Sequence, residues 1–144
     1  MLYPTHLALG LIIGKLTGNY PVALIVTFAV DLDHLYFCFK KRIFSPKKIW
    51  KLNTNPLNIY GNPRTFLHSF IVWFFISLLA IFINKTIGII ISLSYLGHLI
   101  LDMIDGSNFY PFYPLKLRFK GPKIYATKKE FALALCLYLI FFII

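Results

Sequence analysis

The sequence has few charged side chains, and acidic ones are the scarcest. Only 14% of its 144 residues are charged, and 5 are Asp or Glu, whereas 58% are hydrophobic. A soluble domain of this length needs more polar residues to cover its surface. The excess apolar area is therefore expected to face lipid, and the composition predicts an integral membrane protein.

Cysteine is also scarce, and the chain contains no internal repeat or low-complexity tract. The 2 cysteines, Cys38 and Cys136, lie in or near apolar runs and form neither a disulfide framework nor a metal-binding pair. No basic residue precedes the first apolar run, so a cleaved signal peptide is not expected. We therefore predict a single transmembrane domain over residues 1–144.

Long apolar stretches are the main organising feature of the chain. A membrane-spanning helix needs about 20 apolar residues, or fewer when neighbouring helices shield it. Turn signals, such as the Gly18 and Pro21 region, separate the stretches. The sequence predicts an all-α membrane bundle of about five helices, at residues 5–16, 21–36, 65–83, 86–104 and 129–144, of which the first and last are short.

The basic residues, which give a net charge of +10, gather in two connections, residues 40–64 and 106–128. If successive helices alternate in direction, both connections lie on one side, and the positive-inside rule makes that side cytoplasmic. Anionic headgroups attract such residues, so we favour this interpretation over nucleic-acid binding. A multi-pass protein of the inner (cytoplasmic) membrane, in contact with the lipid bilayer, is expected, with its N-terminus inside.

The histidines and acids fall on that same side. They lie toward the inner ends of four predicted helices, although only Lys and Arg were used to orient the chain. The clustering is therefore an independent result. The residues concerned are His6, Asp31, Asp33, His34, His68, His98, Asp102 and Asp105.

The spacing within this set points to a shared ligand. His98 and Asp102 are four residues apart and share a helix face with Asp105, while Asp31 and His34 are three apart. Imidazole and carboxylate are the ligands of zinc and related metals, and several carboxylates suit a two-metal site. Each of these residues, taken alone, is equally compatible with a packing role in the helix bundle or with capping a helix end. A carboxylate at the centre of a membrane helix costs about 2.5–3.5 kcal/mol, so the set favours a metal site.

Three further polar residues flank the histidines. Arg64 lies four residues before His68, and its planar guanidinium suits an anionic substrate group. Alternatively, Arg64 is one of the basic residues that orient the chain in the membrane. Thr5 and Ser69 each adjoin a histidine and are expected to cap a helix or to position a ligand.

Other signals concern helix ends and contacts. Gly97 is expected to permit a close helix contact, and Gly106 to end the fourth helix. The aromatic segment 110–114 is expected at the membrane interface, where it could cover the site. Glu130 lies in the first turn of the last helix, where it suits the helix dipole.

These motifs resemble the YdjM/DUF457 family of bacterial and archaeal membrane-bound proteins, which are assigned as metal-dependent hydrolases. The resemblance runs from Thr5 to about Pro114. The third motif departs from the family pattern, with Pro63 in place of a histidine and Leu67 in place of a threonine, so it implies one ligand fewer. The motifs that carry the resemblance are Thr5-His6, Asp31-Leu32-Asp33-His34, Arg64 with His68-Ser69, and Gly97-His98 with Asp102 and Gly106.

The pattern of His98 and Asp102 is also similar, more distantly, to zinc-dependent phospholipase C and P1-type nucleases, which are all-helical and hold a metal cluster. Together the residues and the resemblances predict a metal-dependent hydrolase at the cytoplasmic membrane interface. A lipid phosphoester, such as an anionic phospholipid, is the substrate class that the resemblances imply.

The predicted hydrolase assigns each polar residue a role. One to three divalent ions, with zinc expected, would be held by His6, Asp31, Asp33, His34, His68, His98 and Asp102. The catalytic residues would be Asp33, Asp105 and Arg64, with Asp33 or Asp105 accepting a proton, and Arg64, Ser69 and Thr5 would bind substrate.

Two other functions use the same residues. A transporter or proton path also needs intramembrane acids and histidines. Carriers, however, bind near the midplane between repeats, and the sequence shows no repeat. In a non-enzymatic membrane adaptor the basic loops would bind anionic lipid or a partner, and the His and Asp residues would be structural. The oligomeric state is left open.

Overall fold

The computed structural model describes residues 1–48, 64, 66–105, 109–115 and 117–144. These residues confirm the all-α prediction, because their regular structure is helical apart from an isolated antiparallel bridge between Phe109 and Phe119. The predicted helix end at Gly106, and Pro63 in the third motif, lie outside the described residues. The helices are α1 (Tyr3–Thr17), α2 (Tyr20–Ala29), α3 (Leu32–Lys40), α5 (Phe70–Ile83), α6 (Lys85–Ile104) and α7 (Lys128–Ile143).

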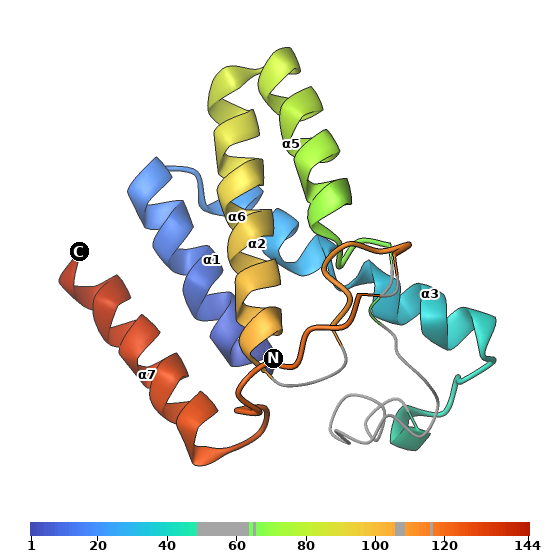
Figure 1. The fold of residues 1–144 in the computed structure, drawn as a ribbon. Helices are drawn as coiled ribbons and strands as arrows, with labels where there is room; N and C mark the ends of the chain where they lie inside the picture. Colours follow the sequence, from blue (N-terminus) through green and yellow to red (C-terminus); the bar gives the residue numbers. More distant parts are fainter. Residues whose placement is uncertain (49–63, 65, 106–108, 116) are drawn as a thin grey trace.

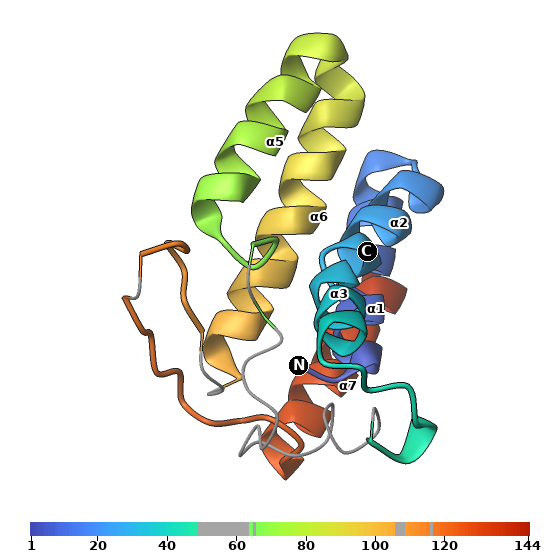
Figure 2. The ribbon, with the colours of Figure 1, turned by 90° about the vertical axis from the view of Figure 1, so that its right-hand side faces the viewer.

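Two helical hairpins form the bundle (Figure 1). In the first, α1 ends at Gly18, which adopts the left-handed conformation with φ 70°, and the Asn19 side chain caps α2. In the second, the Asn84 side chain accepts the Ile87 N–H at 3.0 Å and caps α6. The central helix α6 packs against α1, α2 and α5, and α7 packs along the outer side of α1 (Figures 1 and 2).

Two glycines allow close contacts of α6. A Cβ atom at Gly88 would lie 2.3 Å from the Ile81 backbone nitrogen, so α5 and α6 approach closely near their turn. A Cβ atom at Gly97 would lie 2.7 Å from a methyl carbon of Leu9, which confirms the helix contact expected at this glycine. The second contact places the residue before His98 directly against α1.

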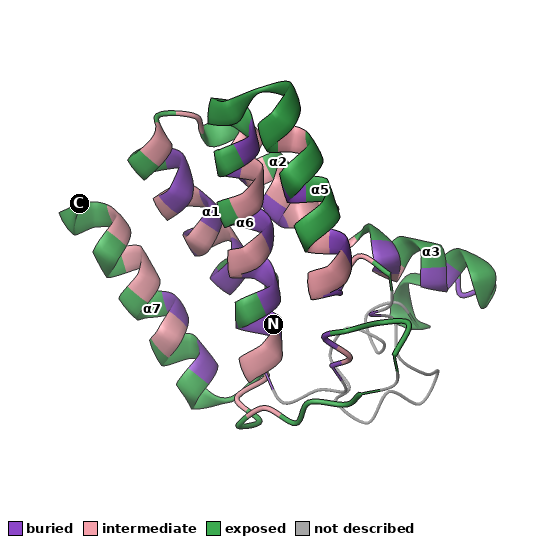
Figure 3. Cartoon of the chain, turned by 45° about the horizontal axis from the view of Figure 1, so that its top comes forward, coloured by how far each residue is buried: buried purple, intermediate pink, exposed green. Residues whose placement is uncertain are grey.

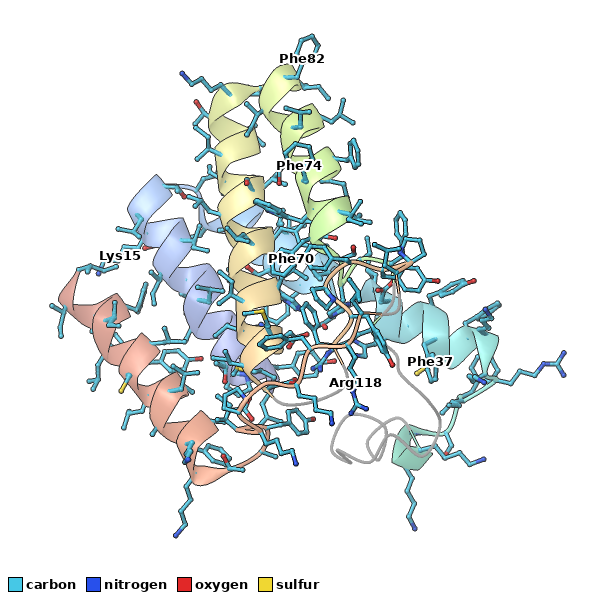
Figure 4. The ribbon with its side chains drawn as sticks, in the orientation of Figure 1. Lys15, Phe37, Phe70, Phe74, Phe82 and Arg118 are labelled. Carbon is cyan, nitrogen blue, oxygen red and sulfur yellow. The ribbon has the colours of Figure 1, made fainter. Side chains whose placement is uncertain are left out.

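The outer surface of the bundle is strongly apolar. Residues Tyr20–Lys40 and Lys85–Ile104 have the length and hydropathy of membrane-spanning helices, and α5 is apolar but shorter. Phe74 and Phe82 point outward from α5 (Figure 4) and are 53% and 88% exposed. Much of α5 is coloured as exposed in Figure 3. A continuous apolar surface of this kind is favourable in lipid and costly in water.

The predicted helix at residues 21–36 is interrupted, which corrects the prediction. In a continuous α-helix the Asp31 N–H would donate to the Thr27 carbonyl. It donates instead to the Phe28 carbonyl at 3.1 Å, and a new helix, α3, begins at Leu32. No proline or glycine lies near this break, so the sequence carries no local signal for it.

Candidate metal centre

The buried end of the bundle brings together imidazoles and carboxylates from four parts of the chain. α6 supplies His98 and Asp102 one turn apart, α1 supplies His6, and the break between α2 and α3 supplies Asp31. His68 comes from the segment that precedes α5. The side chains of His6, His68, His98 and Asp102 are 1% exposed or less.

Two imidazole nitrogens in this cluster each lie close to two carboxylate oxygens. Asp31 Oδ1 lies 3.7 Å from His68 Nε2 and 3.6 Å from His98 Nε2. Asp102 Oδ2 lies 3.2 Å from His68 Nε2 and 3.6 Å from His98 Nε2. Tetrahedral ligands at the usual zinc distances are separated by about 3.4 Å. These four of the six separations are close to that value. We call these four residues the quartet.

The quartet also contains buried polar atoms whose hydrogen-bonding capacity is unused. Among the described residues, His68 Nε2 and His98 Nε2 make no hydrogen bond, and Asp102 Oδ2 makes none besides its ion pair with Arg64 Nε, 2.9 Å away. Buried polar atoms nearly always have a partner, and leaving one unsatisfied costs about 1–3 kcal/mol. A divalent cation bound to the quartet would satisfy all three atoms at once. The residues present therefore fit a metal ion.

The ring of His98 is oriented by the helix break. Its Nδ1 lies 2.7 Å from the Thr27 carbonyl oxygen, which is available because the Asp31 N–H donates elsewhere. A carbonyl only accepts, so Nδ1 must carry the proton, and Nε2 then presents a lone pair to the quartet. The interruption between α2 and α3 thus supports His98 as well as placing Asp31.

Asp33 contacts the far side of His68. Asp33 Oδ2 lies 3.3 Å from His68 Nδ1 and accepts the Leu67 N–H at 2.8 Å. This is the arrangement of a carboxylate that orients a metal-binding histidine from outside the coordination shell. The structure therefore places Asp33 behind His68 rather than among the quartet atoms.

An Asp33→Asn variant is expected to bind zinc about 10- to 100-fold more weakly, because the oriented and more basic state of His68 is lost. Competition with a chromophoric chelator measures the affinity. Glu130→Gln is the matched control, since it removes a buried carboxylate that faces α1 instead of the quartet. Complete loss of binding in Asp33→Asn would make Asp33 a direct ligand, and unchanged affinity would contradict the support of His68.

His6 lies beside the other oxygen of Asp102. Its Nε2 is 3.3 Å from Asp102 Oδ1, and its ring stacks on His98 with centroids 4.0 Å apart and an interplanar angle of 11°. His6, His98 and Asp102 form a second group with the spacing of metal ligands, beside the group of Asp31, His68 and His98. His98 is common to the two groups, and Asp102 Oδ2 lies beside His68 and His98 while Asp102 Oδ1 lies beside His6.

Arg64 lies against the carboxylate of Asp102 and also contacts Asp105. Arg64 Nε lies 2.9 Å from Asp102 Oδ2, and its terminal nitrogen contacts Asp105 Oδ2. The carboxylates of Asp102 and Asp105 also accept hydrogen bonds from the α-ammonium group of Met1. Burial lowers the pKa of Arg64, but the two carboxylates outweigh it and raise the pKa above the ordinary arginine value. Arg64 therefore stays charged and orients Asp102.

The exposed edge of the cluster lies at Asp31 and His34. Their side chains are 15% and 18% exposed, in contrast to the 1% or less of the other three quartet residues. His34 Nδ1 lies 3.0 Å from Asp31 Oδ1, and the His34 ring meets the His68 ring edge-on. Water or substrate would therefore reach the cluster past His34, which belongs to neither metal-ligand group.

The start of α5 is held by the segment that follows α6. The Ser69 side chain accepts the Ile71 N–H at 3.3 Å and donates to the Tyr113 carbonyl at 3.1 Å. The Phe70 N–H donates to the Pro111 carbonyl at 2.8 Å. Ser69 thus caps α5, one of its two expected roles. The aromatic segment packs against Phe70 at this end of the bundle (Figure 4).

The structure shows a role for Glu130 that the sequence did not predict. Glu130 is 1% exposed and accepts hydrogen bonds from the Leu2 N–H at 2.6 Å and the Thr5 hydroxyl at 3.4 Å. It therefore supplies a cap at the start of α1, which carries His6, in addition to suiting the dipole of α7. The sequence signal that could have indicated this role is that Glu130 is the one acidic residue after residue 105.

The chain matches the family model described as the YdjM inner membrane protein over residues 1–144. The chain belongs to the YdjM family. The family predicted from the motifs is thus confirmed, and the description of the YdjM family agrees with a location in the inner membrane. No curated protein and no solved structure matches this YdjM chain.

Proposed function

We propose that this YdjM protein is a membrane-embedded, metal-dependent hydrolase that acts on a lipid phosphoester at the cytoplasmic interface. The observation that carries the proposal is the quartet. Two imidazole nitrogens each lie 3.2–3.7 Å from two carboxylate oxygens, and both nitrogens are buried with no hydrogen bond among the described residues.

The proposed topology has several spanning helices and the basic connections inside. A helix rises 1.5 Å per residue, so His98 lies about 9 Å and Asp102 about 3 Å from the C-terminal end of α6. These depths correspond to the boundary between acyl chains and headgroups on one side of the membrane. A phosphoester in a headgroup could reach that depth, whereas transport sites lie near the midplane.

The proposed ligands of a first ion are the quartet residues, with zinc as the expected metal. His6, together with the second oxygen of Asp102, would contribute to the site of another ion. A bound divalent metal would lower the pKa of water toward about 7 and would polarise a phosphoryl oxygen. Arg64 keeps Asp102 ionised and fixed in orientation, since its guanidinium contacts this carboxylate through two nitrogens.

His34 is the proposed proton acceptor. Of the two acceptors predicted from the sequence, Asp33 contacts His68 and Asp105 contacts Arg64, and both are buried. His34 instead lies at the exposed edge of the cluster, with Nδ1 on Asp31 and Nε2 as its other ring nitrogen. This geometry lets His34 take a proton from water next to the quartet while Asp31 fixes its ring.

Phosphoester hydrolysis by the purified protein tests the proposal. The zinc-loaded protein in detergent is expected to release phosphate or a phosphorylated headgroup from a short-chain phosphatidic acid or phospholipid. His34→Ala is expected to retain zinc and to lose turnover by about 100-fold or more, the usual contribution of a general base. Zinc binding with no release from either a phosphomonoester or a phosphodiester would contradict the hydrolase. Unchanged turnover in His34→Ala would contradict the assignment of the base.

A further inference from the structure

The outward face of α3 carries a stripe of large apolar side chains. They recur at the i, i+3, i+4 and i+7 positions that share one helix face, and each is between 53% and 72% exposed. The opposite face is buried, with Phe37 and Cys38 packed against Ile43. The stripe consists of Leu32, Leu35, Tyr36 and Phe39.

α3 projects from the bundle, and none of the described helices covers the stripe. The helices that pack together among the described residues are α1 with α2, α6 and α7, and α6 with α2 and α5, so α3 is not among these pairs. In Figures 1 and 2, α3 runs crosswise to the α5 and α6 hairpin, level with the lower part of α6. If α6 spans the bilayer, α3 therefore lies along one leaflet instead of crossing it.

Three basic residues follow the stripe at a fixed helix end. The Arg42 N–H donates to the Phe39 carbonyl at 3.1 Å, and the Ile43 N–H donates to the Cys38 carbonyl at 2.9 Å. With Arg42 at φ 54°, these bonds close the helix in a Schellman motif. Lys40, Lys41 and Arg42 are consequently held at the exposed end of α3 next to the apolar stripe.

We propose that α3 is an interfacial helix, with its stripe among the acyl chains and its basic end against anionic headgroups of the same leaflet. An apolar face beside a cluster of Lys and Arg is the combination that such surfaces bind. A deeper position would place three cations in hydrocarbon, and a position in water would expose the whole stripe. The partner is therefore the anionic lipid surface.

This position has a consequence for the metal centre. α3 begins directly after Asp31 and carries Asp33 and His34, so an α3 in the interface holds the exposed edge of the cluster at headgroup depth. Lipid headgroups would then meet the cluster without leaving the bilayer. The location of α3 does not depend on hydrolysis, and its test uses no activity measurement.

Depth measurements along α3 test the proposal. Nitroxide labels are placed by Leu32→Cys, Leu35→Cys or Phe39→Cys in a full chain with Cys38→Ala and Cys136→Ala, in phosphatidylcholine vesicles with and without phosphatidylglycerol. Accelerated relaxation by oxygen and by a water-soluble nickel chelate gives each depth. With phosphatidylglycerol, the three labels are expected at the same depth to within about 3 Å, in the upper acyl region.

The alternatives give different depths. A spanning α3 would separate the labels at residues 32 and 39 by about 10 Å, at 1.5 Å per residue, which would overturn the proposal. If the nickel chelate reaches the labels in vesicles with and without phosphatidylglycerol, the stripe lies in water and is available to a protein partner. This result would also overturn the proposal. Leu79→Cys on the lipid-facing side of α5 provides the acyl reference.

The charge requirement has its own variant. Joint replacement Lys40→Gln, Lys41→Gln and Arg42→Gln is expected to move the α3 labels toward water by roughly 5 Å in phosphatidylglycerol vesicles, the lower end of the depth of interfacial helices. It should leave the Leu79→Cys label unchanged, which also reports that the bundle is intact. An α3 depth that is independent of both these residues and lipid charge would remove anionic lipid as the partner.

Discussion

Replacing His98 by alanine is expected to reduce bound zinc to background. His98 Nε2 lies 3.6 Å from both carboxylate oxygens of the quartet, and His98 also belongs to the second ligand group with His6. Removing an outer-shell partner of a ligand weakens metal binding by about 10- to 100-fold. His98→Ala should lose more than this, because it removes a direct ligand. Metal analysis of the detergent-purified protein after removal of free zinc measures the effect.

The matched control for this result is His34→Ala. His34 is the one histidine outside both ligand groups, so its variant should retain zinc at the level of the unmodified protein. Because His98→Ala also loses the bond to the Thr27 carbonyl, His98→Gln provides a more conservative replacement, and size-exclusion profiles report folding. Equal zinc content in folded His98→Gln and the unmodified protein would exclude a metal site at the quartet.

Arg64→Met is expected to destabilise the fold by about 3–5 kcal/mol, the usual cost of breaking a buried ion pair by removing one partner. The Arg64 side chain is 9% exposed and contacts Asp102 and Asp105, whose carboxylates lie one turn apart on α6. Without the guanidinium, their negative charges would repel each other in a buried environment. Unfolding of the protein in mixed micelles by a denaturing detergent measures the change.

Arg118→Gln is the control for Arg64→Met, because Arg118 is an exposed arginine and its loss should change stability by less than about 0.5 kcal/mol (Figure 4). Adding Asp105→Asn to Arg64→Met should recover part of the loss by removing one of the two charges. Suppose instead that Arg64→Met unfolds like Arg118→Gln but raises the KM for a phosphoester. Arg64 would then bind substrate, the role predicted for it from the sequence.

The helix pattern and the gathering of polar residues could be predicted without the structure. Apolar run length is a local property, and each predicted helix has a counterpart in α1, α2 with α3, α5, α6 and α7. His98 and Asp102 share a face because helical periodicity places i and i+4 side by side. The charge asymmetry of the connections then indicated one common end for residues far apart in the sequence, such as His6 and His68, and the two lie in the same cluster.

The division of roles within the cluster could not be predicted in this way. Asp31 and Asp33 are two residues apart, yet one carboxylate faces the quartet and the other contacts the Nδ1 side of His68. That difference accompanies the break at Asp31, where the Asp31 carboxylate lies beside His68 and His98. Composition and spacing contain no such information, since His68 and His98 lie 35 or more residues away from these two carboxylates.

The sequence alone therefore determined an all-α membrane chain of the YdjM family whose histidines and acids gather at one end. These features depend on apolar run length, helical period and short ordered motifs, all of which are local. Only the tertiary structure decided which atoms face one another at ligand spacing, that Arg64 orients Asp102, and that the apolar stripe of α3 is exposed beside the other described helices. Such features depend on distances between helices, and these are set when the whole bundle packs.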